Sequence, residues 1–86
     1  MVVKNYVLIN ELKHYRSKLG ITQKELAEFL CINPSYYNRI EKGIITPNIK
    51  LCLMIVDAIK ELYAQKTGRR PEKISIERLF MLDDTD

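Results

Sequence analysis

Apolar residues near the start of the chain recur with the spacing of one face of a helix. The set, with polar residues between its members, is Leu8, Leu12, Tyr15 and Leu19. This spacing predicts a first helix over residues 6–18. Gly20 stands where a glycine commonly ends a helix, so the first helix is expected to stop before it.

Two short amphipathic segments follow with only a few residues between them. Thr22 and Glu25 match a capping box, which predicts that a second helix over residues 23–30 begins there. Asn33-Pro34 suits the N-cap and the first helical position of a third helix. This helix is expected to end near Lys42, because Gly43 follows it.

The second half of the chain predicts one long apolar helix and one short one. Residues 48–63 carry apolar side chains on more than one side of a fourth helix. Residues 66–73 are basic and contain Gly and Pro, which indicates a loop or linker. Ser75 can cap a last short helix. Its apolar members are Ile76, Leu79, Phe80 and Leu82.

The scarcity of turn residues favours helices throughout. With three Gly and three Pro in 86 residues, we predict an all-α fold, a compact domain of five helices. Its helices two and three form a helix-turn-helix within a body over residues 1–64. Residues 65–82 form the basic linker and a short helix that packs on the body or in a dimer. Residues 83–86 are an acidic tail that is expected to fray.

The distribution of charge is more informative than the net charge of +3. Residues 1–50 carry eight Lys and Arg against four Glu, and the last four residues contribute three negative charges. A basic body is compatible with a polyanionic partner and equally with ordinary solubility. No signal peptide is visible, and the longest apolar run, residues 51–56, is too short to span a bilayer. We therefore expect a cytoplasmic protein that does not associate with membranes.

Residues that carry enzyme chemistry are scarce in this sequence. His14 is the only histidine, and Cys31 and Cys52 lie 21 positions apart, a spacing that fits neither a metal site nor a redox pair. The sequence contains no nucleophile motif and no phosphate-binding loop. We therefore expect no enzymatic activity, no metal and no cofactor, and we interpret both cysteines as packing groups.

The outer face of the third predicted helix is rich in side chains that can contact DNA. Two helices joined by a short connector must cross steeply, so the second projects and can enter the major groove. Arg39 could form a fork on guanine, and Asn38 could pair with adenine. The side chains that could hold the DNA backbone are Ser35, Tyr36 and Lys42. The alternative is that these residues form a merely solvated face.

A longer pattern surrounds this face. Its elements are Gly20-Ile21-Thr22-Gln23, Glu25-Leu26-Ala27, Ser35-Tyr36, Arg39-Ile40-Glu41-Lys42-Gly43 and Pro47. The pattern resembles the helix-turn-helix of the Cro/cI-type, or xenobiotic-response-element, DNA-binding domains, which have the lambda-repressor-like fold. The resemblance covers about residues 8–60, and residues 74–80 are similar to the closing helix of small members.

The resemblance implies roles for individual residues. Gln23 would bind a phosphate at the start of the second helix, and Ala27 would be small so that helices two and three approach closely. Arg16 and Glu41 would form a partly buried ion pair. The full candidate DNA-binding set is Thr22, Gln23, Asn33, Pro34, Ser35, Tyr36, Asn38, Arg39 and Lys42.

Four positions depart from the family's pattern. Cys31 stands where the turn usually has Gly, which would strain the backbone if its φ is positive. Tyr37 replaces a usual Ile or Val, so its hydroxyl needs a partner or access to the surface. Ile44-Ile45 replaces residues that often meet phosphates. Pro34 removes a hydrogen-bonding side chain from a position that often reads bases.

The resemblance also implies a function and an assembly. We expect a transcriptional regulator, a repressor, that binds double-stranded DNA as a homodimer on an inverted repeat. Such a protein would be bacterial or phage-encoded and associated with the nucleoid. The alternative is an antitoxin or accessory protein that uses the same domain to bind a protein partner. The expected dimer or partner surface comprises Leu51, Met54 and Phe80, unless the C-terminal segment folds over it.

Overall fold

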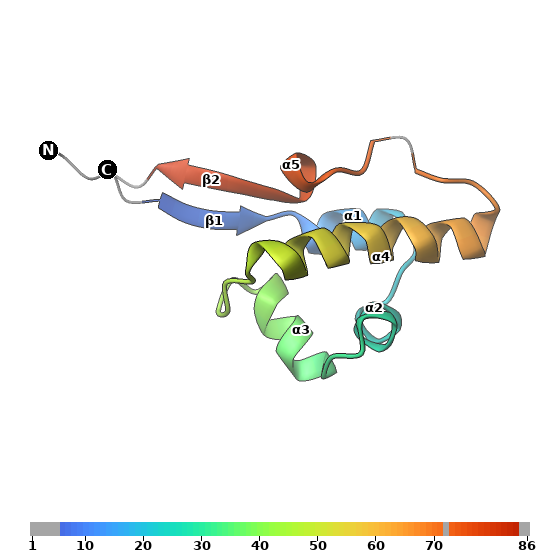
Figure 1. Cartoon of the computed structure of the whole chain (residues 1–86), viewed down its shortest axis with the longest axis horizontal. Helices are drawn as coiled ribbons and strands as arrows, with labels where there is room; N and C mark the ends of the chain where they lie inside the picture. Colours follow the sequence, from blue (N-terminus) through green and yellow to red (C-terminus); the bar gives the residue numbers. More distant parts are fainter. Residues whose placement is uncertain (1–5, 72, 85–86) are drawn as a thin grey trace, which may run out of the picture.

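Five helices and a two-stranded sheet make up the described part of the protein. The computed structural model describes residues 6–71 and 73–84. In chain order the elements are β1 (Tyr6–Asn10), α1 (Leu12–Lys18), α2 (Gln23–Leu30), α3 (Pro34–Glu41), α4 (Ile49–Thr67), α5 (Ile76–Leu79) and β2 (Phe80–Asp84). The long α4 crosses the middle of the molecule, with α2 and α3 on one side and α5 and the sheet on the other (Figure 1).

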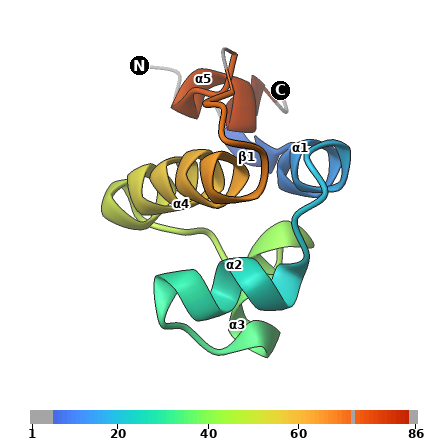
Figure 2. The same cartoon turned by 90° about the vertical axis from the view of Figure 1, so that its right-hand side faces the viewer.

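One hydrophobic core joins these elements, and α4 supplies much of it. The buried residues of α4 are Cys52, Ile55, Val56, Ala58, Ile59 and Leu62. They occupy more than one side of the helix because α4 lies between two layers (Figure 2). Burying each large aliphatic side chain contributes about 1.5–3 kcal/mol, so α4 is the main support of the fold. The helix also runs four residues further than predicted, to Thr67.

The predicted starts of α2 and α3 are confirmed. The Thr22 hydroxyl accepts a hydrogen bond from the Glu25 amide at 3.0 Å, and the Glu25 carboxylate accepts one from the Thr22 amide at 3.1 Å. The Asn33 side chain accepts a hydrogen bond from the Ser35 amide at 2.7 Å. These bonds satisfy backbone N–H groups that a helix leaves without partners at its first turn.

Lys66, in the last turn of α4, holds the start of α2. Its ammonium lies 2.7 Å from the Glu25 carboxylate and donates to the Gly20 carbonyl at 2.9 Å. The hydrogen bond from Lys66, together with the one from the Thr22 backbone, lowers the pKa of Glu25. A lowered pKa in the folded state stabilises the protein only while the carboxylate is charged. This contribution is therefore present above the usual carboxyl pKa and is lost as the pH falls.

The predicted first helix is wrong at its beginning. Residues 6–10 form β1, and α1 starts only at Leu12. Tyr, Val and Ile favour strands, and β1 pairs antiparallel with β2, so that Leu8 lies opposite Leu82. Leu8 still packs against the core, but it does so from a strand. Leu8 would face the core in a helix and also faces it in the strand, so its position alone does not distinguish the two structures.

The C-terminal segment also differs from the prediction. The last helix contains only Ile76–Leu79, and Phe80 begins β2 instead of continuing the helix. Asp83 and Asp84 therefore lie in a strand, not in a frayed tail, while residues 85–86 lie outside the described part. The fold is mostly helical, but the expectation of an all-α domain is corrected by this sheet.

Cys31 confirms the expected strain in the turn between α2 and α3. Its φ of 58° and ψ of 39° lie in the left-handed region, which costs a residue with a Cβ about 1 kcal/mol or more. The backbone N–H of Cys31 bonds to the Glu28 carbonyl at 3.1 Å, so the turn ends α2 while keeping its hydrogen bonds. This tight turn allows α3 to start only a few residues after α2 ends.

Candidate nucleic-acid interface

Helix α3 lies at the edge of the molecule, and α2 holds it there. Figures 1 and 2 both place α3 at the end of the molecule farthest from α5 and the sheet. Its inward side chains, Tyr37 and Ile40, are fully buried, as are Leu26 and Ala27 of α2. Ala27 is thus in the packed core, where a larger side chain would displace its neighbours. One side of α3 is therefore buried in the core, and the other side faces outward.

The residues predicted to contact DNA lie in α3, at its two caps and at the start of α2, and most of them are exposed. The exposed members of that set are Thr22, Asn33, Pro34, Ser35, Tyr36, Arg39 and Lys42. The Arg39 guanidinium and the Lys42 ammonium are cations that can bind guanine or phosphate. A DNA duplex could therefore approach both side chains without unfolding any part of the core.

Gln23 and Asn38, the remaining two candidates, are half-buried and bonded to each other. The Asn38 Nδ2 donates to the Gln23 Oε1 at 3.2 Å, and the Gln23 Nε2 donates to the Glu41 Oε2 at 2.8 Å. Each amide nitrogen carries two hydrogens, so each keeps one donor for a ligand. The chain of bonds orients both side chains before any ligand binds.

The Arg16–Glu41 ion pair anchors this chain of bonds. Arg16 Nη2 lies 3.0 Å from Glu41 Oε1, and its Nε donates to both carboxylate oxygens at 3.3 and 3.2 Å. The two side chains are only 13% and 3% exposed. Arg16 also donates from Nη1 to the Ile21 carbonyl at 3.0 Å. The predicted pair is confirmed, and it ties α1 to the end of α3.

Asn10 adds a second tie to the end of α3. Its Nδ2 donates to the Ile40 carbonyl at 2.9 Å, and its Oδ1 accepts from the Leu12 amide at 3.3 Å. The sequence reasoning missed this residue, because it placed Asn10 inside a helix. It also missed the bonds that link Gln23 to Glu41 and to Asn38. These residues are 18 and 15 positions apart, and no local periodicity connects them.

The Tyr37 hydroxyl is buried near the ion pair without a hydrogen bond. The side chain is fully buried, and its hydroxyl bonds to no residue within 6–71 and 73–84. Burial, with the charge of Glu41 as a smaller cause, raises the pKa of the phenol, so this group stays neutral. The expectation that the hydroxyl finds a partner or reaches the surface is therefore wrong.

Tyr37→Phe is expected to raise the free energy of unfolding by about 1 kcal/mol. A buried hydroxyl that makes no hydrogen bond costs about 1–3 kcal/mol, and phenylalanine removes it while keeping the ring. Urea unfolding followed by circular dichroism measures the change. The half-buried Tyr15, changed to Phe, is the control and should stay within about 0.5 kcal/mol of the parent. A clear loss of stability in Tyr37→Phe would contradict the unbonded hydroxyl.

The three residues of the expected dimer or partner surface differ in exposure. Phe80 is buried in the core, Leu51 is half-buried against it, and Met54 is 41% exposed. The exposed apolar positions of α4 also include Ile49 and Leu53, which lie on one face of the helix at an i, i+4 spacing.

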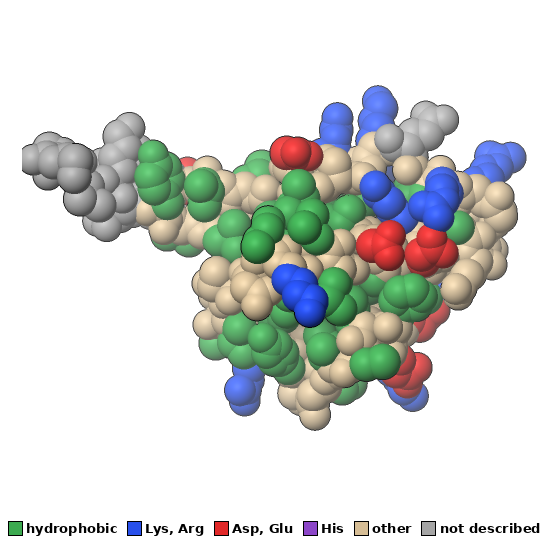
Figure 3. All heavy atoms as spheres, in the orientation of Figure 1, with side chains coloured by type: hydrophobic (Ala, Val, Ile, Leu, Met, Phe, Trp, Pro, Cys, Tyr) green, Lys and Arg blue, Asp and Glu red, His purple; other side chains and the backbone are tan. Residues whose placement is uncertain are grey.

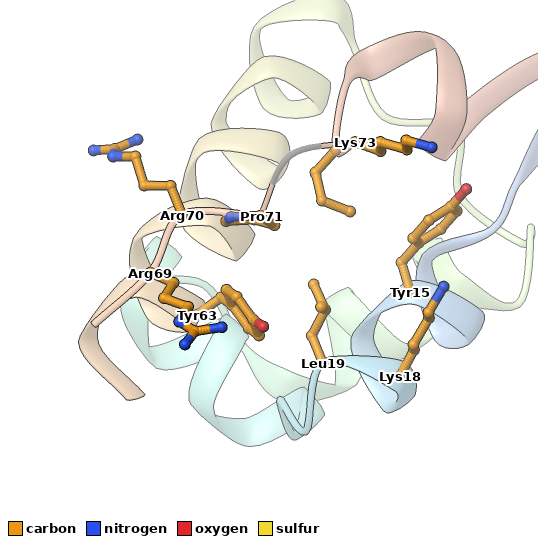
Figure 4. A pocket seen from close by; sticks show the side chains of 9 residues that line it. Tyr15, Lys18, Leu19, Tyr63, Arg69, Arg70, Pro71 and Lys73 are labelled. Carbon is orange, nitrogen blue, oxygen red and sulfur yellow. The ribbon is translucent and has the colours of Figure 1, made fainter. Parts of the chain in front are cut away.

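A hollow of about 350 Å³ lies between α1, α4 and the basic segment after α4. It is lined by Tyr15, Lys18, Leu19, Tyr63, Arg69, Arg70, Pro71, Lys73 and Ile74 (Figure 4). Arg70 turns away from the hollow in Figure 4 and pairs with Glu61. None of the predicted DNA contacts lines it. The basic linker therefore contributes to a different part of the surface from α3.

The described residues contain neither a metal-binding cluster nor a membrane-spanning helix. No group of three His, Cys, Asp or Glu side chains in that part of the chain could hold a metal ion. Among the same residues, no helix combines the length and the apolar character needed to cross a membrane.

A comparison with known protein families gave a match. A family model described as helix-turn-helix matches residues 12–61. The matched segment starts at α1 and ends within α4, so it contains α2, the turn at Cys31 and all of α3. No curated protein and no solved structure matched the chain.

Proposed function

The chain belongs to the Cro/cI-type family of helix-turn-helix DNA-binding regulators, and from this we propose that it is a repressor that recognises one DNA sequence. The observation that carries the proposal is the exposed outer side of α3, where Arg39 and the C-cap residue Lys42 are exposed while the inner side of the helix is buried. The family comprises DNA-binding regulators rather than enzymes, which agrees with the absence of enzyme motifs from the sequence.

We assign the DNA contacts by the chemistry of each side chain. Arg39 and Asn38 read base edges in the major groove, since a guanidinium matches guanine and an amide matches adenine. Ser35, Tyr36 and Lys42 hold phosphates, and they position the helix without selecting a sequence. The remaining contacts come from the start of α2 and the start of α3. They are Thr22, Gln23, Asn33 and Pro34.

We propose that two copies bind an inverted repeat. In helix-turn-helix dimers the recognition helices enter successive major grooves about 34 Å apart, so the operator has the twofold symmetry of the protein. A dimer bound over a promoter would repress transcription by excluding the polymerase. The protein concentration would then set the degree of repression.

Selection of bound duplexes from a random library, repeated at two salt concentrations, tests this function. We expect enrichment of one palindromic sequence with half-sites about 10 base pairs apart from centre to centre. The change in affinity between the two salts measures how many phosphates are contacted. Recovery of the input library without enrichment, even at the lower salt, would contradict sequence-specific binding.

Lys42→Ala is expected to weaken binding to all duplexes by a similar factor. An ammonium on a phosphate adds affinity without reading sequence, so its loss should reduce the slope of log affinity against log salt by about 1. Fluorescence anisotropy titrations at several salt concentrations measure both quantities. Lys73→Ala is the matched control, because Lys73 lines the hollow beside α4, and its slope should not change. An unchanged slope in Lys42→Ala would remove Lys42 from the interface.

A second candidate function is supported by exposed apolar residues near α3. Ile44 is 69% exposed in the loop after α3, where polar or basic residues would suit a DNA backbone better. Phe29 on α2 is 41% exposed. An antitoxin or accessory protein that binds another protein would use such residues. Co-purification of a partner, combined with no duplex binding at low salt, would favour this function over the first.

A further inference from the structure

The two strands form a ribbon that extends beyond the helical body and exposes apolar side chains. Figure 1 shows β1 and β2 reaching past the helices, and Figure 3 shows hydrophobic side chains along them. The exposed members of the ribbon are Tyr6, Val7, Ile9, Met81 and Leu82, with exposed fractions of 38–67%. Apolar side chains exposed together in this way indicate a contact surface.

The two faces of the ribbon differ in what they contact. Asn10 bonds to α3, Leu8 packs against the core, and Phe80 is buried, so the face they share lies against the body at its base. Successive side chains in a strand point to opposite faces. Val7 and Ile9 therefore share the other face with Met81 and Asp83, and all four are exposed; on this face the β1 side is apolar, and the one charge, Asp83, lies on β2.

The edges of the ribbon differ in how well they are protected. The described sheet has only two strands, so each strand has one edge without a neighbouring strand. A two-stranded sheet alone is marginally stable, and proteins usually protect free edges with charged residues. The five residues of β1 include no charge, whereas β2 ends in Asp83-Asp84. The free edge of β1 is therefore the one suited to pair with another strand.

We propose that β1 pairs antiparallel with β1 of a second copy, which joins two ribbons into one four-stranded sheet. Pairing about a twofold axis at Leu8 places Val7 opposite Ile9 of the second copy. Apolar side chains therefore lie opposite each other, and because β1 carries no charged residue, the pairing brings no like charges together. The same pairing through β2, centred on Leu82, would place Asp83 opposite Met81. The occupant is a second copy because this uncharged edge is complementary to itself. The inference rests on the homodimer of the proposed function and locates its interface.

Ile9→Lys tests this interface without DNA. An ammonium at Ile9, which would lie opposite Val7 of the second copy, should raise the dissociation constant of the dimer at least tenfold, as measured by sedimentation equilibrium of the full chain. Ile44→Lys makes the same chemical change at an exposed apolar residue outside the ribbon, and its dissociation constant should match the parent. Circular dichroism shows whether both variants stay folded.

Crosslinking provides a second measurement that does not depend on a disruptive variant. In a Cys31→Ser background, Leu8→Cys should be joined to its counterpart by a short bis-maleimide, while Met54→Cys should not. A monomeric parent, equal dissociation constants for Ile9→Lys and Ile44→Lys, or no crosslink at residue 8 would each overturn the proposal. Since none of these measurements uses DNA, such a result leaves DNA binding standing. Failure of the duplex selection likewise leaves this interface standing.

Discussion

Arg16→Ala is expected to lower the free energy of unfolding by about 3–5 kcal/mol. The Glu41 carboxylate is only 3% exposed, so removing the guanidinium leaves a buried charge without its partner. The Ile21 carbonyl loses its hydrogen bond from Arg16 at the same time. Domains of this size have net stabilities of about 5–15 kcal/mol, so the variant should be close to unfolding at ambient temperature. Urea unfolding followed by circular dichroism measures the loss.

The matched control for Arg16→Ala is a second Arg–Glu pair on the surface. Arg70 pairs with Glu61, but its side chain is 64% exposed, and exposed pairs contribute about 0–1 kcal/mol. Arg70→Ala should therefore unfold at nearly the same urea concentration as the parent. Equal and small losses of unfolding free energy in the two variants would show that the buried Arg16–Glu41 pair stabilises the fold no more than the exposed pair does.

Arg39→Ala is expected to weaken binding to the selected duplex by about 1–3 kcal/mol, or roughly 5- to 150-fold. Alanine removes the fork of N–H donors that matches the O6 and N7 atoms of guanine. The loss should be smaller on duplexes that carry another base at the guanine position, so the variant should also discriminate less. Because Arg39 is exposed, the free energy of unfolding of the variant should differ from that of the parent by less than about 0.5 kcal/mol. Anisotropy titrations with the selected duplex and its single-base variants measure both effects.

Arg39→Lys tests whether the paired N–H donors of the guanidinium contribute to recognition beyond its positive charge. Lysine keeps the positive charge but cannot form the planar pair of hydrogen bonds. It should retain binding to unselected duplexes while losing most of the preference for the selected one. If Arg39→Ala binds the selected duplex as tightly as the parent does, the base-reading residue is not Arg39. The recognition surface would then have to be sought elsewhere on α3 or away from it.

One network joins the stability of the fold to the proposed reading of DNA. The Arg16–Glu41 pair bonds to Gln23, and Gln23 bonds to Asn38. A variant that weakens the pair should therefore also loosen two side chains of the candidate interface. If Gln23 and Asn38 contact DNA as proposed, the core and not the ligand sets the orientation of their amides.

The helix-turn-helix could be read from local sequence because its signals are local. A capping box at Thr22 and Glu25 satisfies the first backbone donors of α2, and Asn33-Pro34 does the same for α3. These interactions join residues that are no more than three positions apart, so the local sequence is enough to predict them. The outward position of Arg39 followed from the same helical period. The Arg16–Glu41 pair was expected only from the resemblance to the family, since nothing local links these residues.

The sheet and the hydrogen bonds around Glu41 were decided by tertiary structure. Residues 6–10 carry an apolar pattern that fits a helix or a strand, and their partner strand lies at the other end of the chain. Only the folded body brings β1 and β2 together, where pairing satisfies their backbone groups. Tyr37 shows the same limit, because its burial depends on α2 and α3 packing around it. The sequence by itself thus determined where α2 and α3 begin and which side of α3 faces outward, since short-range hydrogen bonds and helical period act within one segment. Contacts between segments that are distant in the sequence, such as the β1–β2 pairing and the Gln23–Glu41 hydrogen bond, form only when the core packs.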